Sequence, residues 1–291
     1  RNESSAASDV YKRQEQPHWM IVVLAAMIGQ IGQPGGGFGL GYSAENGIGN
    51  PVKHFKWPAL NQFKNLITDF IPVARYSDML LNPGKNFTFN GQTYSYPNIK
   101  LVYWAGGNPF HHQMNLSKLR KATFKPDTII TNEIWWNSLA RHADIIFPTT
   151  TTLERNDIGF RHWEQTVSPM HKAIDPIGNS RNDFDIFSLI SEKLGIKEQF
   201  TENKNEEEWL KTLWDEAKES ARENNFYLPD FDQFWNGGFF EVLKPTHEQI
   251  LMEDFVKKPE QFPLSNRSKK IEIFSDEVDS FNYSDCPGHP K

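Results

Sequence analysis

The sequence contains very little cysteine and no long hydrophobic run, and each of these features excludes some classes of protein. Cys286 is the only cysteine among 291 residues, which excludes an internal disulfide and a cysteine-based zinc or iron–sulfur centre. The longest apolar run, from Trp19 to Ile28, is too short to span a bilayer and is closed by Gly29 and Pro34. It therefore predicts a helix buried in a core, and no membrane span.

The chain also lacks a basic excess. Its net charge is −6, and lysine and arginine are scattered, which argues against a nucleic-acid surface and a polybasic membrane anchor. Nine histidines are present, but none forms a His-x-x-x-His pair with an acid, and the side chains of adjacent His111 and His112 diverge. The motifs thus predict no metal ligand, and an anionic ligand would need locally placed donors.

The ends of the chain differ from its middle. Residues 1–14 lack periodicity and a starting methionine, so we interpret them as an unmatched leader, disordered or artefactual. Residues 15–291 end on the turn residues "DCPGHPK", and we expect them to be a fragment of a longer protein. Within them we expect an α/β nucleotide-binding core at about residues 98–195 and a mixed helical and strand segment at about residues 196–291.

The middle of the chain alternates between strand and helix patterns. "IKLVYW" and "DTIITNEI" read as buried strands separated by the helical spacing of "NLSKLRKATF". "WNSLARHA" then predicts a short helix and "DIIFPTT" a third strand. This order is typical of parallel β-α-β units. The fold class is therefore α/β with a parallel, dinucleotide-binding-like sheet.

Outside this core the patterns predict further elements. Before it we expect a helix from Leu60 to Phe70 and a hairpin that turns at Asn90-Gly91. After it, an amphipathic helix follows Asp183, a second helix spans residues 205–225, and "SKKIEIFS" (residues 268–275) predicts a late strand.

Polar residues follow each strand of the predicted parallel sheet. Ligands of such sheets bind beyond the carboxyl ends of the strands, so these residues are expected to converge. Glycines let backbone N–H groups approach a pyrophosphate, amides suit a base or ribose edge, a carboxylate accepts N–H or hydroxyl donors, and a guanidinium matches a phosphate. The residues are Gly106 to Asn108 with His111 to Gln113, then Asn132 and Glu133, then Pro148 to Thr152 with Glu154 to Asp157. The pattern predicts a nucleotide site.

Each of these residues also has a purely structural interpretation. Arg155 could form an ion pair with Glu154 or Asp157, and Asp183 could cap the helix that follows it. The glycine-rich segment of residues 29–51 could approach a ligand or serve as a flexible connection, and it lacks the Lys-Ser or Lys-Thr ending of a phosphate-binding loop.

Four blocks resemble a known family. The blocks are "EQPHWMIVVLAAMIGQIGQPGGGFG", "LVYWAGGNPFHHQ", "LARHADIIFPTTTTLERNDIG" and "SRNDFDIF". They resemble the molybdopterin oxidoreductases, and within them the dimethyl sulfoxide, trimethylamine-N-oxide and biotin sulfoxide reductase branch. The resemblance covers about residues 15–291. It implies an incomplete parallel-sheet catalytic domain and a bis(molybdopterin guanine dinucleotide) molybdenum cofactor.

The resemblance also implies roles for individual residues. Asn108 and His112 would lie at the guanine dinucleotide, and Asn132 and Glu133 at its guanosine, although the family more often has aspartate where Glu133 stands. The remaining candidates would contact phosphate, guanine or pterin: Arg155 the phosphate, Asp183 the guanine with Asp185 as its alternative, and Gly37 and Phe38 the pterin. The sequence departs from the family pattern at Gln33 and beyond Leu40, on either side of Gly37 and Phe38, so the assignment of these two residues to the pterin has less support from the motif.

The implied reaction is reduction of a small S-oxide or N-oxide by oxygen-atom transfer. The molybdenum ligand of this branch is a serine earlier in the chain, so no residue here is assigned to the metal or to catalysis. A cytochrome or a soluble reductant would donate electrons, and the resemblance favours the bacterial periplasm over the cytoplasm. Two alternatives stay open: a non-catalytic nucleotide-binding α/β module, and a relative that acts on nitrate or formate.

Overall fold

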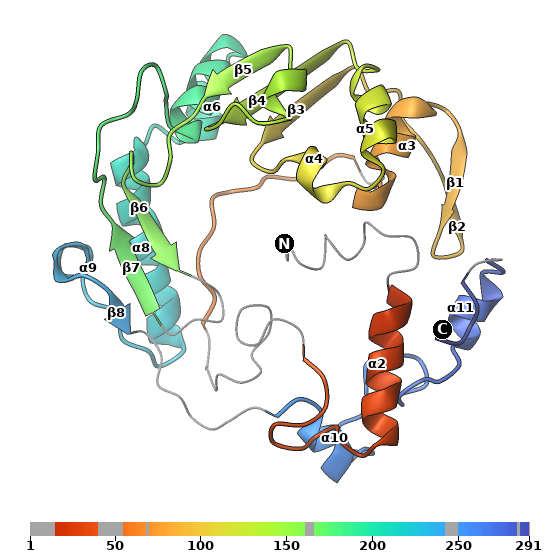
Figure 1. The fold of residues 1–291 in the computed structure, drawn as a ribbon. Coiled ribbons are helices and arrows are strands. Elements are labelled where there is room, and N and C mark those ends of the chain that lie inside the picture. Colours follow the sequence, from red (N-terminus) through yellow and green to blue (C-terminus); the bar gives the residue numbers. More distant parts are fainter. Residues whose placement is uncertain are drawn as a thin grey trace.

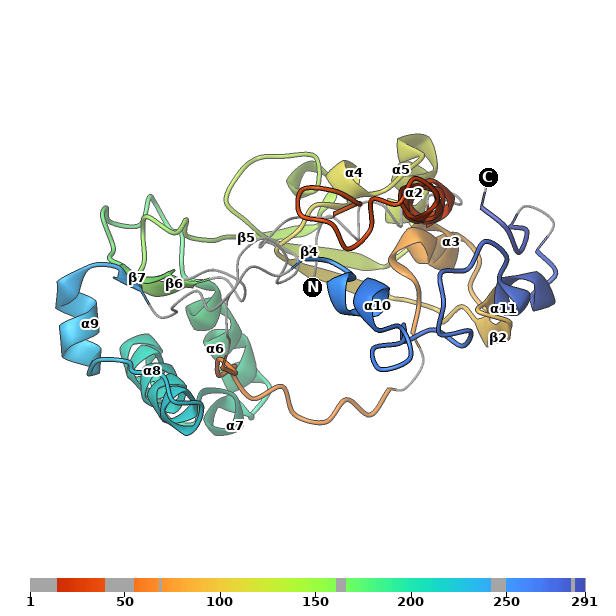
Figure 2. The same cartoon turned by 90° about the horizontal axis from the view of Figure 1, so that it is seen from below.

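The computed structural model describes residues 15–39, 55–67, 70–160, 166–241, 250–283 and 286–290. The predicted leader, residues 1–14, and residues 40–51 of the glycine-rich segment lie outside them. The described elements form three groups in Figure 1: a parallel sheet at the top, an antiparallel sheet with two helices at the left, and the first helix of the described chain near the C-terminal helices at the lower right. Figure 2 shows the parallel sheet between the other two groups.

The parallel sheet contains the three predicted strands. It contains β3 (Leu101–Ala105), β4 (Thr128–Glu133) and β5 (Ile145–Pro148), hydrogen-bonded in the order β3-β4-β5. Both pairs are parallel, with Leu101 opposite Thr128 and Ile130 opposite Ile145. The central strand is the most buried because it has a neighbour on each side. The predicted α/β class with a parallel sheet is confirmed.

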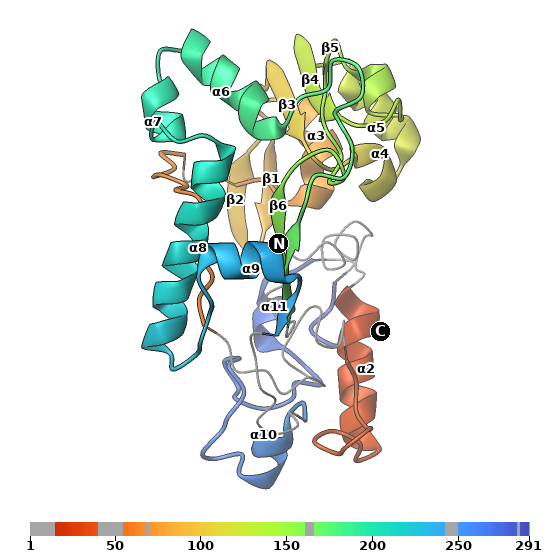
Figure 3. The same cartoon turned by 90° about the vertical axis from the view of Figure 1, so that its left-hand side faces the viewer.

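Helices cover both faces of this sheet, as Figure 3 shows. The helix α5 (Leu116–Thr123) connects β3 to β4 and buries Leu119 and Ala122 completely. It lies beside α3 (Tyr76–Leu81), which follows η1 (Val73–Arg75). An ion pair between Lys118 of α5 and Asp78 of α3 joins the two helices. On the opposite face lies α6 (Asp183–Lys193).

The ring contacts of two neighbouring strand residues fix these faces. Consecutive side chains of a strand point to opposite sides. Accordingly, the ring of Trp104 lies 5.5 Å from that of Tyr76 on α3, whereas the ring of Tyr103 lies 5.4 Å from that of Phe187 on α6. The result is a three-layer arrangement of helix, sheet and helix.

The second group combines an antiparallel sheet with two helices. Its strands are β6 (Asp157–Phe160), β7 (Thr166–Met170) and β8 (Phe240–Glu241), and its helices are α8 (Glu206–Glu223) and α9 (Phe231–Gly237). Helix α8 has the predicted core spacing: Trp214 is 1% exposed and stacks on Phe234 at 3.8 Å between ring centroids. A capping box between Asn205 and Glu208 fixes its first turn.

The third group contains α2 (Glu15–Met27) and two short helices, α10 (Glu253–Lys257) and α11 (Asp276–Ser280). The predicted helix is present, but the prediction that it is buried all round is wrong. Val23 and Ala25 are buried, whereas Leu24 is 54% and Met27 75% exposed. The helix therefore packs along one side only. No helix in the described part of the chain is long and apolar enough to cross a membrane.

Three further predictions of elements are wrong. Residues 60–67 and 70, the described part of the helix predicted from Leu60 to Phe70, form no helix. Leu66 is 86% exposed, and Phe70 packs on the rings of Phe89 and Tyr94 in the hairpin, so no continuous apolar face is buried that could hold a short helix. Residues 268–275 form no strand; Ser275 instead caps α11 by accepting a hydrogen bond from Val278 N. The helix predicted over residues 136–143 is reduced to the 3-10 turn η2 (Ala140–His142).

The predicted hairpin is confirmed. It pairs β1 (Asn86–Phe89) with β2 (Gln92–Ser95), and its turn residues Asn90 and Gly91 both have positive φ, at 47° and 72°. This is the conformation that Asn-Gly favours in two-residue hairpin turns.

Candidate functional site

The three parallel strands end at one edge of their sheet. Ala105 is opposite Asn132, and Asn132 is opposite Phe147 on the far side. Since neighbouring strands lie about 4.8 Å apart, the three strand ends span roughly 10 Å. The predicted convergence of the strand ends is present (Figure 1).

The first strand end presents a buried donor. Gly106 and Gly107 have φ of +82° and +81°, which side-chain-bearing residues rarely adopt, and they turn the chain into α4 (Pro109–His112). Asn108 caps this short helix: its Oδ1 accepts a hydrogen bond from Phe110 N at 3.0 Å. Its Nδ2 is buried and has no partner among the residues that the structure describes. An amide donor thus remains available at this edge.

The second strand end is joined to α6 by a chain of hydrogen bonds. Tyr103 OH donates to Asn132 Oδ1 at 2.8 Å, and Asn132 Nδ2 donates to Asp183 Oδ1 at 2.7 Å. Asn132 is 4% exposed, so this amide is held by protein partners and not by solvent. The predicted site residues Asn132 and Asp183 are therefore brought together. Asp183 does not act as a helix cap; the capping position of α6 is Asn182.

Glu133 points away from this pair, because adjacent strand residues face opposite sides. Its Oε1 accepts hydrogen bonds from Ile134 N at 2.9 Å and Trp135 N at 3.3 Å, and its Oε2 accepts from Asn137 Nδ2 at 2.6 Å. The carboxylate thus organises the turn after β4. That turn exposes the indoles of Trp135 and Trp136 by 68% and 66%.

The third strand end carries a buried hydroxyl and the arginine. Thr149 Oγ1 is buried, with no hydrogen-bond partner in the described part of the chain. The Arg155 guanidinium pairs with Asp157 Oδ2 at 3.2 Å, one of the two structural partners that the sequence allowed. Glu154 has a different function: it is buried, and hydrogen bonds from Thr151 and then Ile177 N hold the pKa of its carboxyl low.

A second polar cluster links this strand end to α8. Thr150 Oγ1 donates to Asn182 Oδ1 at 2.7 Å, and Asn182 Nδ2 donates to Glu206 Oε2 at 2.6 Å. Burial raises the pKa of Glu206, and the nearby charge of Asp185 raises it further, against the opposing effects of Asn182 and Arg155. The predicted residues Arg155 and Asp185 thus lie near the same carboxyl.

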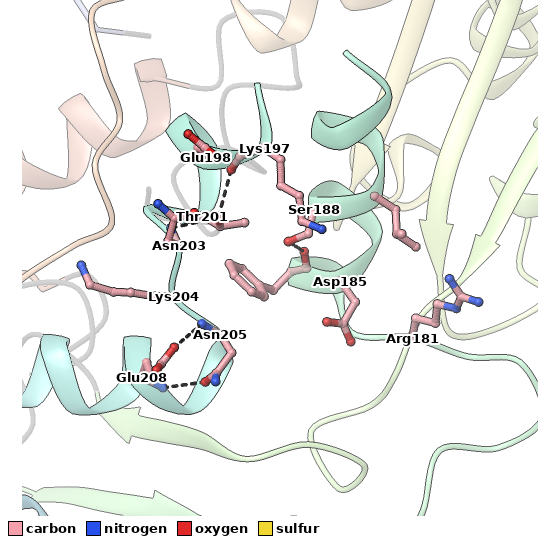
Figure 4. A pocket seen from close by; sticks show the side chains of 12 residues that line it. Arg181, Asp185, Ser188, Lys197, Glu198, Thr201, Asn203, Lys204, Asn205 and Glu208 are labelled. Carbon is pink, nitrogen blue, oxygen red and sulfur yellow. Dashed lines mark hydrogen bonds between the residues drawn. The ribbon is translucent and has the colours of Figure 1, made fainter. Parts of the chain in front are cut away.

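Asp185 lies on a different side of α6 from Asp183, because residues two apart on a helix do not share a face. It lines an open groove of about 860 Å³ between α6, α7 (Lys197–Thr201) and the start of α8. Figure 4 shows the side chains of this groove, among them Lys197, Thr201 and Glu208. The two aspartates therefore have different surroundings: Asp183 bonds to Asn132 at the strand ends, and Asp185 lines the groove.

The remaining candidates lie elsewhere. His112 ends α4 with an exposed side chain. Gly37 and Phe38 lie in the loop after α2, whose Gly32 N donates to Leu251 O at 3.2 Å, just before α10. Figures 1 and 3 both show α10 far from the parallel sheet. The structure does not bring this loop to the strand ends. Among the described residues, no group of His, Cys, Asp and Glu could hold a metal ion.

Sequence reasoning included Thr149 in the strand-end range Pro148 to Thr152 but missed Tyr103, Asn182 and Glu206 as parts of these clusters. The two-residue period of a strand gives a signal for one of them: Tyr103 and Ala105 share a face, and Ala105 is opposite Asn132. No local signal identifies Glu206, because its partner Asn182 is 24 residues away in sequence.

The comparisons with known proteins agree with this architecture. Residues 9–193 match the molybdopterin oxidoreductase family, so more than half of the chain is covered and the chain belongs to that family. Membership supports a molybdenum–molybdopterin cofactor.

Curated relatives are similar along nearly the whole chain. The chain is 42% identical to biotin sulfoxide reductase of Cereibacter sphaeroides and 42% identical to trimethylamine-N-oxide reductase of Haemophilus influenzae, each over 95% of its length. It is 41% identical to the dimethyl sulfoxide/trimethylamine N-oxide reductase of Cereibacter sphaeroides. The chain spans 37%, 35% and 35% of these relatives.

Among solved structures, acetylene hydratase from Pelobacter acetylenicus matches 66% of this chain and 24% of its own. The sequence identity is 14% and the TM-score is 0.42.

Proposed function

We propose that this chain is part of a molybdenum-dependent oxidoreductase that reduces S-oxides or N-oxides by oxygen-atom transfer. We further propose that its strand-end edge binds the guanosine and phosphate part of molybdopterin guanine dinucleotide. The observation that carries the first statement is the 42% identity over 95% of the chain to relatives named for biotin sulfoxide and trimethylamine-N-oxide reduction.

The residues at the edge fit a nucleotide. Asn108 Nδ2 and Thr149 Oγ1 are buried polar atoms without a partner among the described residues, and such atoms are costly unless a ligand or water satisfies them. Gly106 and Gly107 leave the backbone bare beside them. A ligand rich in oxygen and ring nitrogen atoms would satisfy both donors.

The roles of the chain's own residues follow from this fit. Asn108 would donate to the dinucleotide, and Asn132 with Asp183 would hold the guanine edge. Arg155 would meet a phosphate after its guanidinium exchanges Asp157 for the ligand, since a guanidinium binds either anion through the same N–H groups. Glu133 would act indirectly, by holding the turn that borders the site.

The remaining candidates are assigned more broadly. His112, the last residue of the helix α4 that Asn108 caps, would reach the dinucleotide from the exposed side of the helix. Gly37 and Phe38 would meet the pterin from their separate loop, and Asp185 is the alternative guanine partner. When bound, the molybdenum–pterin group supplies the two-electron oxygen-transfer chemistry, which no side chain of this chain supplies.

The test separates the ligand contact from the helix cap. In Asn108→Asp the Oδ1 acceptor for Phe110 N is kept, the Nδ2 donor is replaced by an acceptor, and a negative charge is added, which the control below adds as well. The matched control is Asn115→Asp, because Asn115 caps α5 in the same way, through Lys118 N at 3.1 Å, on an exposed surface. Molybdenum by mass spectrometry and guanine nucleotide released by acid hydrolysis are measured on the purified protein.

We expect Asn108→Asp to retain roughly one-tenth or less of the bound nucleotide and molybdenum, and Asn115→Asp to retain both in full. The loaded protein is then assayed with a reduced dye and dimethyl sulfoxide, trimethylamine N-oxide or biotin sulfoxide. Full occupancy in Asn108→Asp would contradict the assignment of the strand-end edge. Loaded protein that reduces none of the oxides would contradict the proposed reaction.

A further inference from the structure

We propose that Tyr103 is a positioning residue for the guanine edge of the ligand, and that it acts through Asn132 on Asp183. This inference rests on the proposed function and deepens it. Tyr103 would not touch the ligand; it would set the orientation of the two groups that do.

Two hydrogen bonds fix the Asn132 amide. Its oxygen faces the Tyr103 hydroxyl at 2.8 Å and its nitrogen faces Asp183 Oδ1 at 2.7 Å. The reversed amide would place its oxygen against the Asp183 carboxylate, where two acceptors would meet. The carboxylate therefore selects this orientation, and the phenol hydroxyl holds the amide oxygen in it by donating. At 4% exposure, Asn132 has little access to water that could replace either partner.

The same chain of bonds determines what Asp183 presents to a ligand. Its Oδ1 is used by Asn132, while its Oδ2 accepts no hydrogen bond from any residue that the structure describes. The Asn132 amide keeps a second N–H that donates to no residue that the structure describes. The site thus offers a carboxylate acceptor held at a fixed angle, which suits a ligand edge with two adjacent N–H donors.

The phenol is itself held in place. Its ring lies 5.4 Å from that of Phe187 and 6.4 Å from that of Phe147. Phe187 follows Asp183 by one helical turn on α6, so the ring contact and the hydrogen-bond chain bind the same face of that helix. Burial, and then the charge of Asp183, raise the pKa of Tyr103, against the opposing effect of the hydrogen bond to Asn132.

The ligand edge defined by this geometry can be probed with free nucleotides. Guanine carries adjacent ring N–H and exocyclic NH₂ donors, and hypoxanthine carries the ring N–H alone. Their diphosphates, GDP and IDP, therefore differ by one donor to the Asp183 carboxylate. A carboxylate that is held correctly distinguishes them, and a loosely held one distinguishes them less.

The experiment uses the full chain purified from a host that makes no molybdopterin, with GDP and IDP binding measured by calorimetry. We expect the wild-type chain to bind GDP about 10-fold more tightly than IDP. Tyr103→Phe removes only the hydroxyl. We expect it to weaken GDP binding roughly 5- to 10-fold and to reduce the GDP-to-IDP ratio to about 2.

The matched control is Tyr94→Phe. Tyr94 OH donates to Gln92 Oε1 at 2.8 Å on the exposed hairpin, so the same atom is removed far from the parallel sheet. Its GDP affinity and its GDP-to-IDP ratio should equal those of the wild type. A purely structural loss of stability in Tyr103→Phe would lower the folded fraction but leave the ratio unchanged.

The outcomes distinguish the two proposals. A wild-type chain that binds neither nucleotide overturns the proposed nucleotide site and this inference with it. A folded Tyr103→Phe chain with the wild-type ratio overturns the function of Tyr103 alone. If Tyr103→Phe does not fold, the side-chain amide resonances of Asn132 in the wild-type chain decide: a shift on GDP binding supports the inference, and GDP binding without a shift overturns it.

Discussion

Asn132 Nδ2 donates a hydrogen bond to Asp183 Oδ1 at 2.7 Å, and this one contact joins the end of β4 to the first turn of α6. The residues are 51 positions apart in sequence. The contact gives the strand-end edge its negative acceptor, and it also contributes to stability.

The first prediction concerns that stability. Asn132→Ala leaves Tyr103 OH and Asp183 without their partner, and we expect it to lower the free energy of unfolding by about 2 to 4 kcal/mol. Urea denaturation measures the change. Asn236→Ala is the control, because Asn236 Nδ2 donates to Asp232 O at 2.8 Å on the exposed side of α9, and the loss of this bond should cost under about 1 kcal/mol. Equal costs would show that the Asn132 amide is not a buried junction.

Glu133 provides a second prediction. Glu133→Ala removes a carboxylate that accepts three hydrogen bonds from the next turn, so we expect a loss of about 1 to 2 kcal/mol in the free energy of unfolding. The control is Glu216→Ala, because Glu216 is exposed on α8 without a hydrogen bond or ion pair to a described residue. This substitution should change the free energy of unfolding by under about 0.5 kcal/mol. An undiminished stability in Glu133→Ala would mean that the carboxylate serves the ligand and not the turn.

The third prediction concerns pH. The pKa of Glu206 is raised in the folded chain, mainly by burial, so the folded state favours its protonated form. Stability from this group is therefore greatest below the unfolded pKa and falls as pH rises through the folded pKa. Glu206→Gln, which keeps an acceptor for Asn182, should make the chain more stable at pH 7 and remove this part of the pH dependence.

Glu207 is the control of opposite sign. Its hydrogen bond and ion pair with Lys211 lower its pKa, so its contribution is present above the unfolded pKa and is lost as pH falls. Denaturation measured from pH 4 to pH 8 should therefore show Glu207→Gln as neutral or slightly destabilising at pH 7. A loss of stability at pH 7 in Glu206→Gln would contradict the assigned shift.

The fourth prediction concerns the exposed indoles. Trp135→Ala should change the free energy of unfolding by under about 0.5 kcal/mol, because 68% of the residue is already exposed. Trp214→Ala, by contrast, empties a core position that is 1% exposed and should cost about 3 to 5 kcal/mol. Thermal and urea unfolding compare the two. A large cost for Trp135→Ala would indicate packing that the described contacts do not contain.

Local patterns predicted the parts of the fold that depend on local chemistry. Continuous apolar runs predicted β3, β4 and β5, and Asn90-Gly91 predicted the turn of the hairpin. The patterns failed where tertiary contacts decide. The apolar residues near Leu66 have no surface to pack on and stay extended, and Ser275 caps a helix in place of pairing in a strand.

The candidate site shows the same division. Adjacent residues Asn132 and Glu133 were expected to act together at one guanosine, yet the pleat of β4 sends them to opposite faces. The separation of Asp183 from Asp185 follows likewise from helix geometry. The hydrogen bonds of Asn132 to Asp183 and of Asn182 to Glu206 join residues 51 and 24 positions apart in sequence, and no local pattern predicts them.

The consecutive residues Asn182 and Asp183 hold different parts of the molecule: Asn182 binds Thr150 and Glu206, and Asp183 binds Asn132. A ligand that binds the Asp183 carboxylate therefore also restrains the neighbouring residue Asn182, which bonds to Glu206 at the start of α8. Ligand binding at the sheet edge should slow amide hydrogen exchange in the first turns of α8, a helix that the ligand itself need not reach.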